Sequence, residues 1–196
     1  MKKGINLFYH LPKELSLDAF LMWVMVFIER NDEVDEASQI FFDILVLRPE
    51  DRGKKVTHLE ASRKDQESEN KTDIVLKFRL DGKPCTVLFE TKISAQTALR
   101  GYQNLNSHIY RVIYIKLDHL KHHESLLAHK RGYHIVDTEM LLVSLEPLFK
   151  FSSIIAHYGE YLHDNHRLTA KKAIGDDLNS EDLYKLRTKY LRFLTR

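Results

Sequence analysis

A predicted β-hairpin near the middle of the chain constrains the fold most strongly. The stretch from Thr72 to Lys92 reads TDIVLKFRLDGKPCTVLFETK. Asp81-Gly82 is a strong signal for a two-residue hairpin turn, and a run rich in apolar residues lies on each side of it. Successive side chains of a strand point to opposite faces of the sheet. The alternation therefore predicts that Ile74 and every second residue up to Leu80 face a core.

Charged residues gather at the open end of this hairpin. Glu90 and Lys92 share one face of the second strand, and Asp73 lies at the start of the first. A two-residue turn would place Asp73 opposite Glu90. A four-residue loop would place Asp73 opposite Lys92, and Pro84 favours this loop because proline cannot donate to a strand ladder. Either loop brings the three charged groups to one face, with opposed residues about 5 Å apart at Cβ.

Two carboxylates this close repel one another unless a cation joins them. One such cation is a hard divalent ion such as Mg²⁺, which prefers oxygen ligands and often keeps several waters. A lysine beside the ion could hold an attacking water or help to deprotonate it, and the ion would stabilise charge on a phosphate oxygen. The pattern is therefore typical of metal-assisted phosphodiester hydrolysis. The alternative is a structural salt bridge, in which Lys92 pairs with Glu90 or Asp73 at the end of the sheet.

The rest of the chain alternates between helical and strand patterns. The order of these segments along the chain predicts an α/β fold, with a mixed central sheet and helices on both faces. The expected helices cover about 14–29, 34–47, 94–108, 120–130, 138–165 with a break near Pro147, and 179–193, and the expected strands outside the hairpin cover 54–61, 110–117 and 132–137.

Composition excludes several classes of protein. Cys85 is the only cysteine, so an intrachain disulfide cannot form, which favours a reducing compartment. The most apolar run, Phe20–Ile28, is too short to cross a bilayer, which needs about 20 residues, and it lacks the flank of a cleaved signal peptide. We therefore expect a cytoplasmic protein without a membrane partner. There is also no Walker loop, GxGxxG or GxSxG motif.

Two further features have both a functional and an ordinary interpretation. The formal net charge is only +2, but residues 166–196 are more basic than the rest and could contact phosphate or form a solvated helix face. Histidines cluster in DHLKHHESLLAH, where His119 and His123 have the i, i+4 spacing of a zinc-binding pair. No HExxH motif accompanies them, so a solvated helix is the favoured interpretation.

The order of motifs resembles the PD-(D/E)xK nuclease superfamily. Asp73 is followed after sixteen residues by Glu90-Thr91-Lys92 on an apolar strand. ELSLDAFLMWVM resembles the opening helix of one bacterial branch, VLFETKISA resembles I-I-E-N-K-I-x-A, and ALRGY resembles Q-L-x-x-Y. The resemblance covers about residues 14–165 and implies the restriction-endonuclease-like fold, with an αβββαβ core and extra C-terminal helices. It predicts a nuclease-like domain over 1–165, extended by a basic helical segment over 166–196.

The resemblance also implies roles for individual residues. Asp73, Glu90 and the main-chain carbonyl of Thr91 would hold Mg²⁺ or Mn²⁺, Lys92 would position the attacking water, and Glu14 would be an additional acidic residue of the site. Supporting residues would be Glu60, Gln96, Tyr102 and Gln103.

The activity implied is divalent-metal-dependent cleavage of nucleic acid, with DNA the expected substrate, in defence or repair, and a homodimer is compatible with cutting both strands. The alternative is a catalytically inactive nucleic-acid-binding or assembly module with the same fold.

Overall fold

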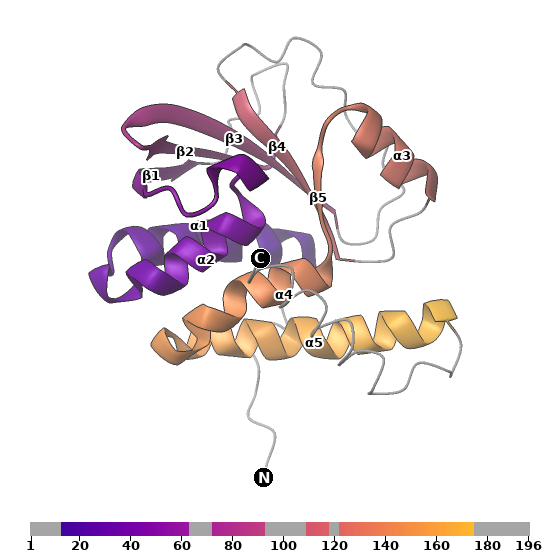
Figure 1. The fold of residues 1–196 in the computed structure, drawn as a ribbon. Coiled ribbons are helices and arrows are strands. Elements are labelled where there is room, and N and C mark those ends of the chain that lie inside the picture. Colours follow the sequence, from indigo (N-terminus) through magenta and orange to yellow (C-terminus); the bar gives the residue numbers. More distant parts are fainter. Residues whose placement is uncertain (1–12, 63–71, 93–108, 118–121, 175–196) are drawn as a thin grey trace.

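The computed structural model describes residues 13–62, 72–92, 109–117 and 122–174 (Figure 1). Side chains are described from Leu17 to Asp164 within these ranges. The predicted helices at 94–108 and 179–193 lie outside the described residues. The elements in chain order are α1 (Lys13–Glu29), α2 (Asp35–Leu45), β1 (Val56–Ser62), β2 (Ile74–Leu80), β3 (Lys83–Lys92), β4 (Ile109–Lys116), α3 (His122–Lys130), β5 (His134–Val136), α4 (Thr138–Leu145) and α5 (Ser153–Ile174), with short 3-10 helices at Asp32–Val34, Pro49–Asp51 and Glu146–Phe151.

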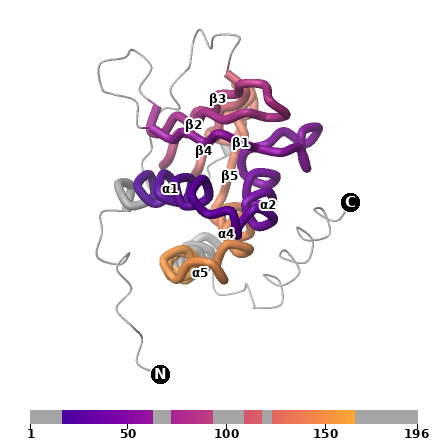
Figure 2. The backbone as a smooth tube through the Cα atoms, turned by 90° about the vertical axis from the view of Figure 1, so that its left-hand side faces the viewer, coloured from indigo at the N-terminus to yellow at the C-terminus, as the bar shows by residue number. Residues whose placement is uncertain are grey.

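The strands form one mixed sheet in the order β1-β2-β3-β4-β5. The first three strands pair antiparallel, and β4 and β5 continue the sheet parallel to β3. Helices α1 and α2 lie against one face of the sheet, with α4 and α5 beyond them (Figures 1 and 2). Helix α3 lies on the other side of the sheet (Figure 1). The predicted mixed α/β architecture is therefore confirmed.

The hairpin between β2 and β3 closes with the two-residue turn. Asp81 and Gly82 both have positive φ angles, of 49° and 81°, as the twist of a tight hairpin requires, and Leu80 pairs directly with Lys83. The four-residue loop is therefore not formed. Pro84 is accommodated within β3 because its position, one residue after the turn-flanking pair, needs no N–H toward β2, and the pairing with β4 begins only at Thr86.

The hydrophobic core lies on the face of the sheet predicted from the alternation. Ile74 and Leu76 of β2 and Phe89 of β3 are fully buried there and pack against α1, which is apolar nearly all round and whose buried side chains include Leu17 and Leu21. A smaller cluster on the other face, beneath α3, contains Leu88, Val112, Tyr114, Ala128 and Tyr133. The site described below lies at the C-terminal end of β3, the strand that contributes residues to both clusters.

The helical region near the C-terminus breaks where proline was expected to break it. Helix α4 ends at Leu145, the 3-10 helix containing Pro147 follows, and α5 begins at Ser153. Helix α5 then continues to Ile174, across the boundary predicted at 165. That division into a nuclease-like domain and a basic extension stays a prediction.

In the part of the chain that the structure describes, no helix has the length and apolar character needed to cross a membrane.

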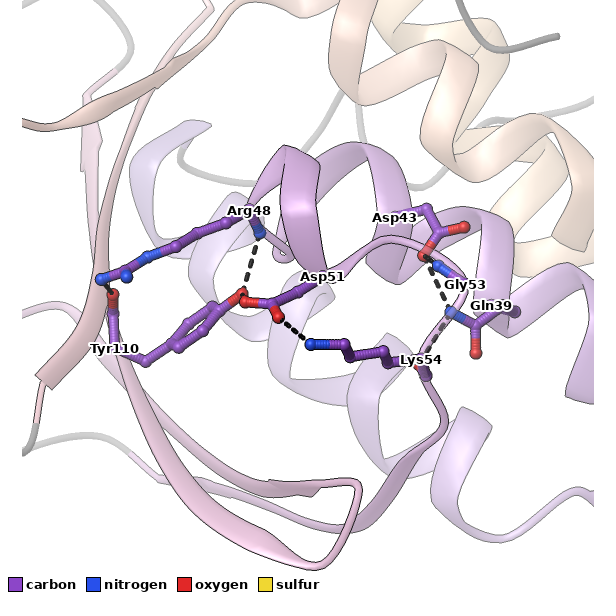
Figure 3. A network of polar contacts seen from close by, with 7 residues as sticks. All are labelled: Gln39, Asp43, Arg48, Asp51, Gly53, Lys54 and Tyr110. Atoms are coloured by element: carbon purple, nitrogen blue, oxygen red, sulfur yellow. Dashed lines mark hydrogen bonds and ion pairs between the residues drawn. The ribbon is translucent and has the colours of Figure 1, made fainter. Parts of the chain in front are cut away.

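A polar network anchors the connection between α2 and β1 to the start of β4 (Figure 3). The Tyr110 hydroxyl accepts a hydrogen bond from the backbone N–H of Arg48 at 2.9 Å and donates one to Asp51 at 2.7 Å. Lys54 forms an ion pair with the same Asp51 carboxylate. Burial, together with the Asp51 carboxylate, raises the pKa of Tyr110 to about 12. This network occupies the end of the sheet near the hairpin turn, away from Asp73 and Glu90, and its charges satisfy one another.

We expect Tyr110→Phe to destabilise the fold moderately. The substitution keeps the ring under the Arg48 guanidinium, 4.7 Å from the ring centroid, but removes both hydroxyl hydrogen bonds. The free energy of unfolding should fall by about 1–2 kcal/mol, measured by urea denaturation followed by circular dichroism. An unchanged denaturation midpoint would show that water replaces the hydroxyl without cost.

Candidate active site

The open end of the β2–β3 hairpin brings together the residues that carry the sequence motif. The pairing of β2 with β3 brings them together, because Ile74 pairs with Phe89 and the backbone N–H of Asp73 donates to the Phe89 carbonyl at 3.1 Å. Asp73, one residue before β2 begins, therefore lies beside the last residues of β3, and its carboxylate reaches Thr91 and Lys92. The direct pairing of Asp73 with Glu90 stays a prediction. The Glu90 side chain is only 2% exposed, although it is charged.

Lys92 links the two carboxylates. Its Nζ lies 2.8 Å from Glu90 Oε1 and 3.5 Å from Asp73 Oδ2. Burial by itself would lower the pKa of Lys92, but the hydrogen bond and charge of Glu90, followed by those of Asp73, outweigh it and raise the pKa above its ordinary value. Lys92 is therefore positively charged at neutral pH in this arrangement. It can donate hydrogen bonds to a water or a phosphate oxygen, but it cannot accept a proton.

Thr91 lies between Glu90 and Lys92 and holds the Asp73 carboxylate from the backbone. Its N–H donates to Asp73 Oδ2 at 2.7 Å. Because the N–H and C=O of one strand residue point toward the same neighbour, the Thr91 carbonyl faces the edge where β2 has ended. The Lys92 carbonyl points the other way and accepts a hydrogen bond from Leu117 N–H at 3.2 Å. The Thr91 carbonyl is thus directed to the side of Asp73.

Asp18 of α1 is a third carboxylate at this site, and it is not among the residues predicted from the sequence. Its Oδ1 lies within hydrogen-bonding distance of Thr91 Oγ1, which is also 3.2 Å from Asp73 Oδ2. A hydroxyl has one proton to donate, so it cannot satisfy both carboxylates at once. Because α1 begins at Lys13, Asp18 lies in the body of the helix. The available signal was that Asp18 is the only charged residue from Leu17 to Ile28.

The other predicted site residues fall into two groups. Glu60 is exposed on β1, where it pairs with Lys77 of β2, and the structure does not bring it to the cluster. Glu14 lies in the first turn of α1, before the first described side chain. Three further predicted residues, Gln96, Tyr102 and Gln103, lie outside the described residues, as does His119 of the histidine pair. His123 is exposed on α3, as a solvated helix predicts.

The donor atoms at this site suit a hard divalent cation. The carboxylates of Asp73 and Glu90 and the Thr91 carbonyl supply oxygen only, which is the ligand type that Mg²⁺ and Mn²⁺ prefer. Within the described ranges, no three His, Cys, Asp or Glu side chains lie close enough together to hold a metal ion. The two carboxylates, the carbonyl and waters would therefore form the ligand set, and Lys92 would have to release Glu90.

Comparison with known proteins gives one structural similarity. No protein-family model matches the chain, and no curated protein matches it in sequence. A solved structure of the MspJI restriction endonuclease in complex with a 27-mer oligonucleotide aligns with a TM-score of 0.35 and 12% sequence identity. The alignment covers 81% of this chain and 36% of that one, so this chain spans about a third of the length of the endonuclease.

Proposed function

We propose that this protein is a divalent-metal-dependent nuclease that hydrolyses phosphodiester bonds in DNA, with a role in defence or repair. The observation that supports the proposal is the convergence of Asp73, Glu90 and Lys92 at one strand end, with the Thr91 carbonyl directed to the same side. Asp73, Glu90 and that carbonyl would hold Mg²⁺ or Mn²⁺. When bound, such an ion supplies charge stabilisation for a phosphate oxygen and lowers the pKa of a water.

The residues of the chain would divide the work around that centre. Lys92, charged and next to both carboxylates, would orient the attacking water or the scissile phosphate by hydrogen bonding. The Thr91 N–H fixes the Asp73 carboxylate in place. Asp18 adds negative charge on the side of α1, and Glu14, four residues earlier in the same helix, is our further candidate for an acidic residue of the site.

A non-catalytic nucleic-acid-binding or assembly module is the second candidate, and one observation favours it. Lys92 lies 2.8 Å from Glu90, so an ammonium group already compensates the buried carboxylate, as a structural salt bridge would. Such a module would bind nucleic acid in a salt-dependent way without turnover.

Calorimetric titration with Mn²⁺ separates the two candidates. We expect the wild-type protein to bind the ion, and Asp73→Asn to bind it at least about tenfold more weakly, because one of two charged ligands is lost. Glu36→Gln is the matched control, since Glu36 is an exposed acid in the first turn of α2, and it should bind like wild type. A folded wild-type protein that binds no Mn²⁺ would contradict the nuclease proposal and favour the second candidate.

A further inference from the structure

A second buried ion pair lies next to Glu90 and Lys92, on the neighbouring strand. The parallel register of β3 and β4 places Tyr114 beside Glu90 and Lys116 beside Lys92, and partners in a ladder present their side chains to the same face. Lys116 is 4% exposed, and its Nζ lies 3.9 Å from Oε1 of Glu124 on α3, which is 5% exposed. Lys116 and Glu124 therefore lie next to Glu90 and Lys92, on the face of the sheet that α3 covers.

Stability alone is a poor explanation for this pair. Removing two charges from water carries a large cost, and apolar residues of similar size commonly stabilise a fold as well as a buried ion pair or better. A separation of 3.9 Å is long for a charge-assisted hydrogen bond. The pair also belongs to a face whose neighbouring side chains, such as Leu88 and Val112, form an apolar cluster. Its position beside the carboxylates, not its strength, is the notable property.

Tyr114 connects the two pairs electrostatically. Its ring is 1% exposed, and its hydroxyl has no hydrogen-bond partner among the described residues. Burial, then the charges of Glu124 and Glu90, raise the pKa of Tyr114 to about 12. The hydroxyl thus lies in the field of both glutamates, with little water near it to screen one from the other. Charges act over longer distances in such a poorly solvated region than at the surface.

We propose that Lys116 and Glu124 are positioning residues that set the affinity of the Asp73–Glu90 site for its divalent cation. The proposal rests on the proposed function. The fixed positive charge of Lys116 opposes the approach of a cation to Glu90, and the negative charge of Glu124 offsets part of that opposition. The two residues act through the electrostatic field, without contacting the ion. With both residues present, the affinity of the site for the cation would lie between the weaker affinity expected with Lys116 alone and the stronger affinity expected with Glu124 alone.

Opposite changes in Mn²⁺ affinity test this proposal. By calorimetry, Lys116→Met should bind Mn²⁺ about tenfold more tightly and Glu124→Gln about tenfold more weakly, because a unit charge within about 10 Å acts strongly on a divalent ion at low effective dielectric. The double variant should return to within about threefold of wild type, since the two charges are removed together. A purely structural pair would instead weaken binding in both single variants, or change it in neither.

Two controls keep the outcomes separate. Lys130→Met removes one positive charge from the exposed end of α3, so it matches Lys116→Met in net charge and should change the affinity less than about twofold, because solvent screens it. Thermal unfolding of each variant shows whether it is folded, and Lys116→Gln replaces Lys116→Met if that variant is not. Tight wild-type binding with single-variant shifts of the same sign would overturn this inference but leave the nuclease proposal intact. Absence of binding in the wild type would overturn both.

Discussion

Substitution of Glu90 by alanine is expected to lower metal-dependent cleavage of DNA by about 10³-fold or more, because the loss of a metal ligand removes several kcal/mol of transition-state stabilisation. Glu90 is one of two side-chain carboxylates proposed to hold the ion, and a neutral water in the space left by the truncated, buried side chain would not replace its negative charge. Plasmid and oligonucleotide cleavage with Mg²⁺ or Mn²⁺ measures the effect. We expect the same loss for Asp73→Ala and Lys92→Ala, since residues that act as a unit are not additive.

The decisive comparison is between cleavage and binding. Glu90→Gln retains the shape of the side chain and should lose cleavage like Glu90→Ala, while salt-dependent DNA binding is retained in both. Glu36→Gln, with its exposed position on α2, should cleave at the wild-type rate. Robust cleavage by folded Glu90→Ala protein would contradict the assignment of this residue.

Local pattern was sufficient to predict the hairpin and its two faces. The alternation from Ile74 to Leu80 is the alternation of burial in the structure, because a strand with one face on a core has few other ways to bury its apolar residues. The turn was the open question, with two loop lengths compatible with the charges. Asp81 and Gly82 decided it, since both adopt the positive φ angles that Asp-Gly tolerates. The proximity of Asp73 to Thr91 and Lys92 follows from that turn.

Contacts between distant segments could not be predicted in the same way. Asp18 contacts Thr91 across 73 positions of the sequence, and the rotation of α1 that makes this contact depends on how the whole helix packs. Helical spacing cannot give that rotation for a helix that is apolar nearly all round.

Glu124 is a buried residue in a segment whose composition predicts exposure. Its surroundings in the sequence, KHHESLLAHK, are polar and histidine-rich, so a solvated helix was the natural expectation. That expectation holds for His123, which is exposed, but Glu124 is buried against Lys116 of β4. Polar composition describes a segment on average and does not reveal which single side chain turns toward the sheet.

Lys92→Met should separate a metal site from a salt bridge most directly. Without divalent ions, we expect the variant to lose about 3 kcal/mol of unfolding free energy, because removing one partner of a buried pair leaves the other without its compensating charge. Lys54→Met is the matched control, since its ion pair with Asp51 is exposed on the lysine side, and it should change the unfolding free energy far less because solvent screens an exposed pair. Denaturation curves recorded at one pH and several ionic strengths measure the loss of unfolding free energy in both variants.

Added Mn²⁺ then gives the two interpretations opposite outcomes. If Asp73 and Glu90 hold the ion, Mn²⁺ takes over the compensating role of the missing ammonium group, and the variant regains stability by about 2.7 kcal/mol at a concentration of 100 times the dissociation constant. The gain should exceed that of the wild type at equal Mn²⁺, because Lys92 no longer has to release Glu90 before the ion binds. If Lys92 is only a structural partner of the two carboxylates, Mn²⁺ would stabilise Lys92→Met no more than it stabilises Lys54→Met.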